Sequence, residues 1–328
     1  MTTQYDAIIV GGGPAGLSAA LYLGRVRRRT LVLDGGRPRN ATSPAAHGVF
    51  TRDGTPPKQL LEQARRQLSV YSTVELRPVE AAGAEARPKG FIVRLTDGQE
   101  VQGRRLLLAC GVRDELPAVD GFTENWGKSV LHCAYCHGFE FADQPIAIYA
   151  CGRAAIESAA SLLHLSRHLL ICTDGHCDLT EGDRRRLGDH HVRMIESPLV
   201  SVSGASPRLV LHFADGSSVV RSAIFLKPAL SLASRIPLDL GCKLDAPGRL
   251  QVNAGWRTTV PGVYAAGDIA TPKSFVAVAA ASGAQAAVAL DGELAQEDFG
   301  GEWSGPLCSR EAAGQKAKLD GLAGRLKE

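Results

Sequence analysis

The stretch Tyr5-Asp6-Ala7-Ile8-Ile9-Val10-Gly11-Gly12-Gly13-Pro14-Ala15-Gly16 decides the fold, because it turns a buried strand into a glycine loop at the start of a helix. An apolar helical segment, Leu17–Leu23, follows it. Thr30-Leu31-Val32-Leu33-Asp34 then reads as a second strand that ends in an acid. This order of strand, turn, helix and strand predicts a parallel βαβ unit.

Three glycines of the turn each have a task. Gly11 permits the tight turn, Gly13 leaves room for a pyrophosphate at the helix N-terminus, and Gly16 lets helix and strand pack closely. Asp34 lies 18 residues beyond Gly16, where its carboxylate can accept hydrogen bonds from ribose hydroxyls. A glycine turn without a ligand would leave Asp34 unexplained, so the sequence predicts a dinucleotide site.

The end of the chain returns to this unit. Residues 260–266 predict a strand leading into Gly267-Asp268, whose carboxylate is placed to bind the ribityl or phosphate part of a flavin. Phe275–Leu290 is a helix of small apolar residues, and its N-terminus can direct N–H groups at a developing flavin anion.

The middle of the chain repeats the first motif in damaged form. Residues 144–149 predict a strand, but the turn after it offers Cys151 and keeps only Gly152 as a glycine. After the next strand, Thr173-Asp174-Gly175-His176 holds no arginine cluster for a 2′-phosphate. We therefore expect a second dinucleotide fold in which NADPH binding is unlikely, although weak binding stays open.

These patterns predict an α/β protein with two Rossmann-like (three-layer ββα) dinucleotide-binding domains, the second inserted into the first. The first domain is expected to comprise residues 1–112 and 243–328, and the inserted domain residues 113–242. A chain of 328 residues with 45% hydrophobic content can build both cores.

Composition excludes several other classes of protein. The formal net charge is only +3 and the arginines are spread out, which argues against a nucleic-acid partner. No apolar run reaches membrane-spanning length, and the chain enters a strand without a charged leader, so we expect a cytoplasmic protein. Its eight cysteines are then expected to be mostly free thiols.

Cys133-Ala134-Tyr135-Cys136-His137-Gly138 is where redox chemistry can occur. Two thiols at this spacing can close a disulfide, and His137 can exchange protons near neutral pH or be merely a surface residue. Zinc is the lesser alternative even with His132 and His137 near, because no second C-x-x-C pair supplies ligands. We predict a redox disulfide and no metal site.

The motifs together resemble the low-molecular-weight thioredoxin reductases over residues 4–298. Three departures, at His137, at the damaged second turn and at Phe275-Val276-Ala277, are similar to the FAD-dependent dithiol oxidases of gliotoxin and holomycin type. The resemblance implies FAD, a homodimer and a small-molecule or protein dithiol as substrate. It also implies that Cys136 faces the flavin and Cys133 meets the substrate.

The site residues expected from motif and resemblance form two groups. The catalytic group is Cys133, Cys136 and His137. The FAD-binding group is Gly11, Gly13, Pro14, Ala15, Gly16, Asp34, Gly35, Arg39, Asn40, His47, Gly111, Gly267, Asp268, Val276 and Ala277.

The expected function is a dithiol oxidase that passes electrons to oxygen or another acceptor. Two alternatives stay open at this point. One is a disulfide reductase driven by ferredoxin, by a second flavin in the vacated pocket or weakly by NADPH. The other is a redox-sensing flavoprotein whose cysteines switch without turnover.

Overall fold

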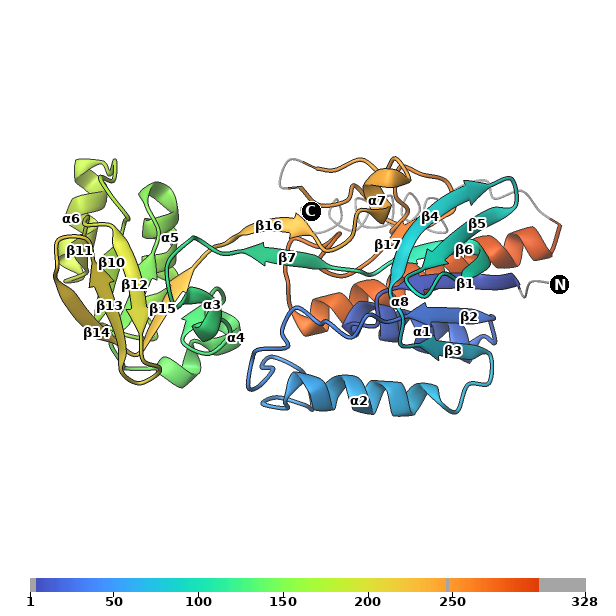
Figure 1. The fold of residues 1–328 in the computed structure, drawn as a ribbon, viewed down its shortest axis with the longest axis horizontal. Helices are drawn as coiled ribbons and strands as arrows, with labels where there is room; N and C mark the ends of the chain where they lie inside the picture. The colour runs from blue at the N-terminus through green and yellow to red at the C-terminus, as the bar shows by residue number, and fades with distance from the viewer. Residues whose placement is uncertain (1–3, 246–247, 301–328) are drawn as a thin grey trace, which may run out of the picture.

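The structure is a computed structural model that describes residues 4–245 and 248–300. Two α/β bodies lie side by side and are joined by the antiparallel strands β7 (Val112–Glu115) and β16 (Ala229–Leu232), as Figure 1 shows. The first body is built from both ends of the chain and the second from its middle. Among the described residues, no helix is long and apolar enough to span a bilayer.

The first domain is built on a seven-stranded sheet of order β3-β2-β1-β6-β5-β4, with β17 also paired to β6. Its parallel strands are β1 (Gln4–Val10), β2 (Thr30–Leu33), β3 (Val74–Arg77), β6 (Glu100–Leu108) and β17 (Val263–Ala265). The antiparallel meander adds β4 (Ala81–Arg87) and β5 (Gly90–Leu95) to the first half of β6. The first half of β6 pairs with β5 and its second half with β17, so this strand joins the antiparallel and parallel parts of the sheet.

The helices α1 (Pro14–Arg25), α2 (Pro57–Leu68) and α8 (Val276–Asp298) cover one face of this sheet, and the meander folds over the other. Small residues let α1 and α8 touch, since a Cβ on Gly283 would lie 2.0 Å from the Ala15 carbonyl oxygen. Helix α8 runs eight residues beyond the predicted end at Leu290, where Asp291 and Asp298 pair with Arg28.

The inserted domain has the same three-layer plan. A parallel sheet of order β11-β10-β9-β15-β8 lies between helices and a three-stranded antiparallel sheet. The parallel strands are β8 (Val130–Leu131), β9 (Ile146–Tyr149), β10 (Leu169–Cys172), β11 (Arg193–Ile195) and β15 (Ala223–Leu226). The antiparallel strands are β12 (Leu199–Ser203), β13 (Leu209–Phe213) and β14 (Ser218–Arg221). The helices are α3 (Phe122–Asn125), α4 (Ala134–His137), the 3₁₀ helix η1 (Phe139–Phe141), α5 (Gly152–Leu162) and α6 (Glu181–Asp189).

The second crossing between the domains lies earlier than the sequence suggested. It occurs at β16, about ten residues before the expected boundary at 242. The segment after β16 contains the short helix α7 (Ile236–Asp239), and Ile236, Leu240 and Cys242 pack into the core of the first domain. Hydrophobic burial therefore assigns residues 233–242 to the first domain, which local sequence pattern could not reveal.

Replacing Gly283 by valine should destabilise the protein by at least about 2 kcal/mol, because the new side chain would overlap the α1 backbone. Ala281→Val is the matched control: Ala281 is exposed on the same helix and should change stability by less than about 1 kcal/mol. Urea unfolding followed by circular dichroism measures both. Equal destabilisation of the two variants would contradict close packing of α1 and α8.

Candidate active site

A cavity of about 750 Å³ opens at the carboxyl ends of the first domain's parallel strands and is lined by both domains. The first domain contributes the turn at 11–15, the loop at 34–47, residues 109–114 and the start of α8. The second domain contributes Trp126, Gly127, His132, Cys136 and His137. The cavity thus joins the predicted dinucleotide turn to the predicted redox motif.

The glycine turn leaves an open cradle. Gly11 has φ +116°, and nothing lies within 4 Å of the point where a Cβ on Gly13 would stand. Asp34 lies over Gly12, with Oδ2 accepting from Arg65 Nη2 at 2.7 Å and Oδ1 from the Gly36 N–H at 2.8 Å. Open backbone at a helix N-terminus beside a fixed carboxylate fits the pyrophosphate and ribose of FAD.

A buried ion-pair cluster centres on Arg39. Its Nε and Nη2 donate to both oxygens of Asp114, at 2.8 and 2.5 Å, and its Nη1 donates to Asp268 at 2.8 Å. The side chains of Asp114 and Arg39 are only 5% and 17% exposed. These hydrogen bonds outweigh desolvation and raise the pKa of Arg39, so it stays cationic. The cluster ties the 35–47 loop to β7 and to the turn after β17.

Cys133 and Cys136 form a disulfide across the short helix α4, with Cα atoms 5.3 Å apart. Cys133 is the N-cap residue, and its sulfur accepts from the Cys136 N–H at 3.1 Å. Cys136 lines the cavity and Cys133 does not. Tyr135, 83% exposed, stands between them with its ring edge-on to Phe275 at 6.0 Å.

Two histidines of the cavity are held neutral by their surroundings. Burial lowers the pKa of His137 below its ordinary value of 6.5, with Glu140 opposing and His47 adding to the shift. Burial and then the charge of Arg39 lower the pKa of His132, whose ring stacks on Trp126 at 5.5 Å. At neutral pH both imidazoles can accept a proton rather than give one.

Contacts between the domains hold the disulfide over the cavity. His47 of the first domain pairs through Nε2 with Glu140 at 3.2 Å, and through Nδ1 with Asp53 at 3.3 Å. The Gly127 backbone lies against Thr42, since a Cβ on Gly127 would stand 2.4 Å from Thr42 Oγ1. His47 therefore bridges the two domains as well as lining the cavity.

Most of the expected site residues line this one cavity: Gly11, Gly13, Pro14, Ala15, Asp34, Gly35, Arg39, Asn40, His47, Gly111, Gly267, Asp268, Val276, Cys136 and His137. Gly16, Ala277 and Cys133 do not line it. Gly16 packs against Gly11, whose carbonyl oxygen lies 1.9 Å from the position of a Cβ, as its predicted packing task requires. Sequence reasoning missed Arg65 and Asp114, whose roles depend on partners 31 and 75 residues away.

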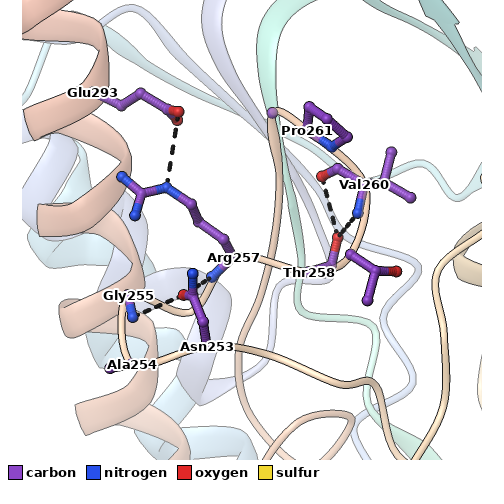
Figure 2. A pocket seen from close by; sticks show the side chains of 10 residues that line it. Asn253, Ala254, Gly255, Arg257, Thr258, Val260, Pro261 and Glu293 are labelled. Carbon is purple, nitrogen blue, oxygen red and sulfur yellow. Dashed lines mark hydrogen bonds and ion pairs between the residues drawn. The ribbon is translucent and has the colours of Figure 1, made fainter. Parts of the chain in front are cut away.

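A second hollow of about 480 Å³ lies in the first domain between residues 253–262 and α8 (Figure 2). Asn253 Oδ1 accepts from the N–H groups of Gly255 and Arg257, at 2.9 and 3.1 Å. Arg257 in turn pairs with Glu293 at 3.8 Å. The described residues that line this hollow include no cysteine or histidine.

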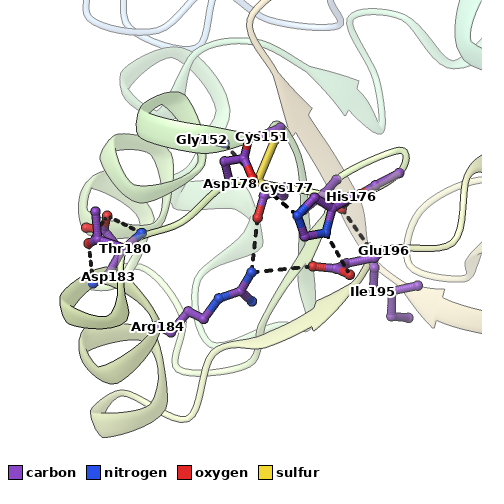
Figure 3. The surroundings of a disulfide bond; sticks show 12 residues. Cys151, Gly152, His176, Cys177, Asp178, Thr180, Asp183, Arg184, Ile195 and Glu196 are labelled. Carbon is purple, nitrogen blue, oxygen red and sulfur yellow. Dashed lines mark hydrogen bonds and ion pairs between the residues drawn. A yellow bond between two sulfur atoms is a disulfide. The ribbon is translucent and has the colours of Figure 1, made fainter.

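The expectation of mostly free thiols is wrong for a second pair of cysteines. Cys151 and Cys177 form a disulfide at the ends of β9 and β10 (Figure 3). The sequence signal was the unusual Cys151 in the damaged turn, but its partner 26 residues away is brought near only by the parallel pairing of the two strands. In the described part of the chain Cys110, Cys172 and Cys242 are free, and no group of residues there could hold a metal ion. Cys308 lies outside it.

Comparison with known proteins fits this geometry. A family model described as pyridine nucleotide-disulphide oxidoreductase matches residues 5–288. The chain belongs to this family. It is an FAD-dependent disulfide oxidoreductase of the thioredoxin reductase type.

Relatives of this oxidoreductase cover nearly the whole chain. A thioredoxin reductase of Gibberella zeae is 30% identical over 333 residues, which is 88% of this chain and 97% of the relative. The thioredoxin reductase sirT of Leptosphaeria maculans is 31% identical over 300 residues, covering 86% of this chain and 92% of the relative. The crystal structure of HlmI matches with a TM-score of 0.84 and 35% identity, over 97% of this chain and 99% of that one.

Replacing Arg39 by glutamine should destabilise the oxidoreductase by about 3 kcal/mol, because Asp114 would be left buried without its cation. We also expect this variant to retain less flavin. Arg37→Gln in the same loop is the control: its pair with Glu80 is exposed and should contribute less than about 1 kcal/mol. Thermal unfolding and the ratio of flavin to protein absorbance are measured for both variants. Equal stability and equal flavin content of the two would contradict a stabilising role of the Arg39 cluster.

Proposed function

We propose that this oxidoreductase is a dithiol oxidase, which closes a disulfide in a reduced substrate through Cys133 and Cys136. The observation that carries the proposal lies at the second nucleotide turn, where the Gly152 N–H donates to Cys177 Sγ at 2.9 Å. In a dinucleotide-binding domain the N–H groups at this helix start face the pyrophosphate. Here the N–H group is bonded to a disulfide sulfur instead of facing a pyrophosphate, which argues against NADPH as the electron donor.

Charges around the second turn support the same direction. Tyr149 OH donates to Asp174 at 2.6 Å, and His176 lies between Asp178 and Glu196, at 3.2 and 3.8 Å. Arg184 also reaches this loop, but it pairs with Glu196 at 3.8 Å and donates to the Cys177 carbonyl oxygen, while the other carboxylates repel a 2′-phosphate. A dithiol substrate supplies the electrons instead and needs no pyridine nucleotide.

The two cysteines divide the chemistry. The substrate thiolate attacks Cys133 Sγ, the Cys133–Cys136 bond breaks, and Cys136 leaves as a thiolate that faces the cavity. The second substrate thiol then displaces Cys133 and closes the product disulfide. Neutral His137, next to Cys136, accepts the proton that the substrate thiol releases.

The cradle around Gly13, Asp34 and Asp268 would hold the FAD, and the N-terminus of α8 would direct its free N–H groups into the same cavity. When bound, FAD would supply the acceptor for the electron pair of the reduced cysteines, with oxygen or another acceptor as the final oxidant. A homodimer remains a prediction from the resemblance, and a cytoplasmic location remains a prediction from the sequence.

The proposal is tested by anaerobic titration of the purified yellow protein with dithiothreitol and, separately, with NADPH. Dithiothreitol should bleach the flavin absorption band, NADPH should not, and air should restore the band. Cys136→Ser should abolish bleaching by dithiol, because the cysteine facing the cavity is lost. Rapid bleaching by NADPH would identify a thioredoxin reductase, and two flavins per chain would favour a second flavin as donor.

Replacing His137 by alanine should slow dithiol-driven bleaching by about a hundredfold. Since burial lowers the pKa of His137, the imidazole is neutral above that pKa and is lost as a base when pH falls through it, below 6.5. The acidic fall in rate should disappear in His137→Ala. The pH dependence of stopped-flow bleaching measures this, with the exposed His190→Ala as control. An unchanged profile in His137→Ala would exclude its role in proton transfer.

A further inference from the structure

The Cys151–Cys177 disulfide lies beyond the carboxyl ends of the neighbouring parallel strands β9 and β10 of the inserted domain (Figure 3). Cys151 follows β9 and is the N-cap residue of α5, Cys177 lies in the loop after β10, and their Cα atoms are 5.6 Å apart. Carboxyl ends of parallel strands are where open α/β sheets bind their ligands. Neither cysteine lines the 750 Å³ cavity, so this pair is separate from Cys133 and Cys136.

The two sulfurs lie in different surroundings. Cys151 is exposed, whereas Cys177 has no exposed surface. Gly152, the first residue of the 11-residue helix α5, donates its N–H to Cys177 Sγ at 2.9 Å. A helix N-terminus stabilises a thiolate, and a stabilised thiolate leaves a disulfide faster. An incoming thiolate can therefore reach Cys151 Sγ, and Cys177 is the better leaving group.

We propose that Cys151–Cys177 is a second thiol–disulfide exchange site, which takes one electron pair from a dithiol independently of Cys133 and Cys136. A thiolate of the dithiol attacks Cys151 Sγ, the bond to Cys177 breaks, and its electron pair leaves on Cys177 Sγ beside the Gly152 N–H. The second thiol of the dithiol then attacks the mixed disulfide, closes a disulfide within the reductant and releases Cys151. The dithiol loses two electrons and two protons, and the two cysteines gain them.

The loop that carries Cys177 keeps other attachments when the disulfide opens. Arg184 Nη2 donates to the Cys177 carbonyl oxygen at 3.1 Å, and Thr173 Oγ1 donates to the Gly175 carbonyl oxygen at 2.5 Å. These bonds join the loop to α6 and to the end of β10 without using either sulfur. Exchange therefore needs no unfolding, and the released thiolate stays at the N-terminus of α5.

The experiment treats native full-length protein anaerobically with dithiothreitol in one arm and with a reduced thioredoxin in the other. Samples are quenched in acid, alkylated in denaturant and mapped by mass spectrometry. Cys151 and Cys177 should become alkylated at a rate within about tenfold of Cys133 and Cys136, and should pair again after re-oxidation. Reduction by dithiothreitol alone assigns the site to small dithiols, and reduction by thioredoxin assigns it to protein dithiols.

Two results would overturn the proposal. One is a Cys151–Cys177 pair that stays closed in the native protein while Cys133 and Cys136 are reduced, which is the behaviour of a structural crosslink. The other is a pair of thiols already present in the oxidised protein. In a parallel sample alkylated without denaturant, the buried Cys172 should react little throughout, which shows that the protein has not unfolded.

Single variants test the asymmetry of the two sulfurs. In Cys177→Ser the remaining Cys151 should react with an aromatic disulfide reagent at least about tenfold faster than Cys177 does in Cys151→Ser. Equal rates would contradict attack at Cys151. Because peptide mapping of the wild-type protein needs no substitution, the proposal stays testable if either variant folds poorly.

Discussion

The molecule depends on one buried cation shared by two carboxylates. Taking Arg39, Asp114 and Asp268 out of water costs several kcal/mol for each charge, and only nearly complete pairing offsets that cost. The geometry is therefore strict: the loop after β2, the linker strand β7 and the turn after β17 must meet at one point. Since β7 is also one of the two connections to the inserted domain, the cluster anchors that connection beside the cavity.

The local parts of this arrangement could be predicted from sequence, and the distant pairings could not. The turn at 11–16 carries its own reasons for Gly11, Gly13 and Gly16, and the run of small apolar residues in α8 predicts a helix. Nothing in the sequence, by contrast, distinguishes Asp114 from other acidic residues, because only the fold places it on β7 against Arg39. The predicted boundary of the inserted domain at 242 differs for a similar reason, because Ile236 joins the core of the first domain only through tertiary packing. Propensity and spacing predict contacts within about one supersecondary unit, whereas the contacts of Asp114 and Ile236 depend on the assembled fold.

The two domains show how one fold can carry different chemistry at equivalent edges. Both place a helix N-terminus at the carboxyl end of a parallel strand, with a vacant Cβ position at Gly13 and at Gly152. In the first domain the adjoining loop supplies Asp34, held by Arg65, and the edge stays open for a dinucleotide. In the second domain the adjoining loop supplies Cys177, whose sulfur accepts a hydrogen bond from the Gly152 N–H. Function lies in the loops at the strand ends rather than in the sheet that presents them.

Burial, more than any single charge, lowers the pKa of the two histidines in the cavity. Arg39 lies close enough to His132 to oppose its protonation, and burial acts on His132 and His137 in the same direction. Arg39 itself is balanced by Asp114 and Asp268, whereas the two neutral imidazoles can take up protons released beside Cys136. The proposed oxidation of a dithiol would benefit from such bases near the disulfide, because the thiolate is the reactive species. Burial thus acts on both histidines beside the disulfide, and the ion-pair cluster of the first domain acts in addition on His132.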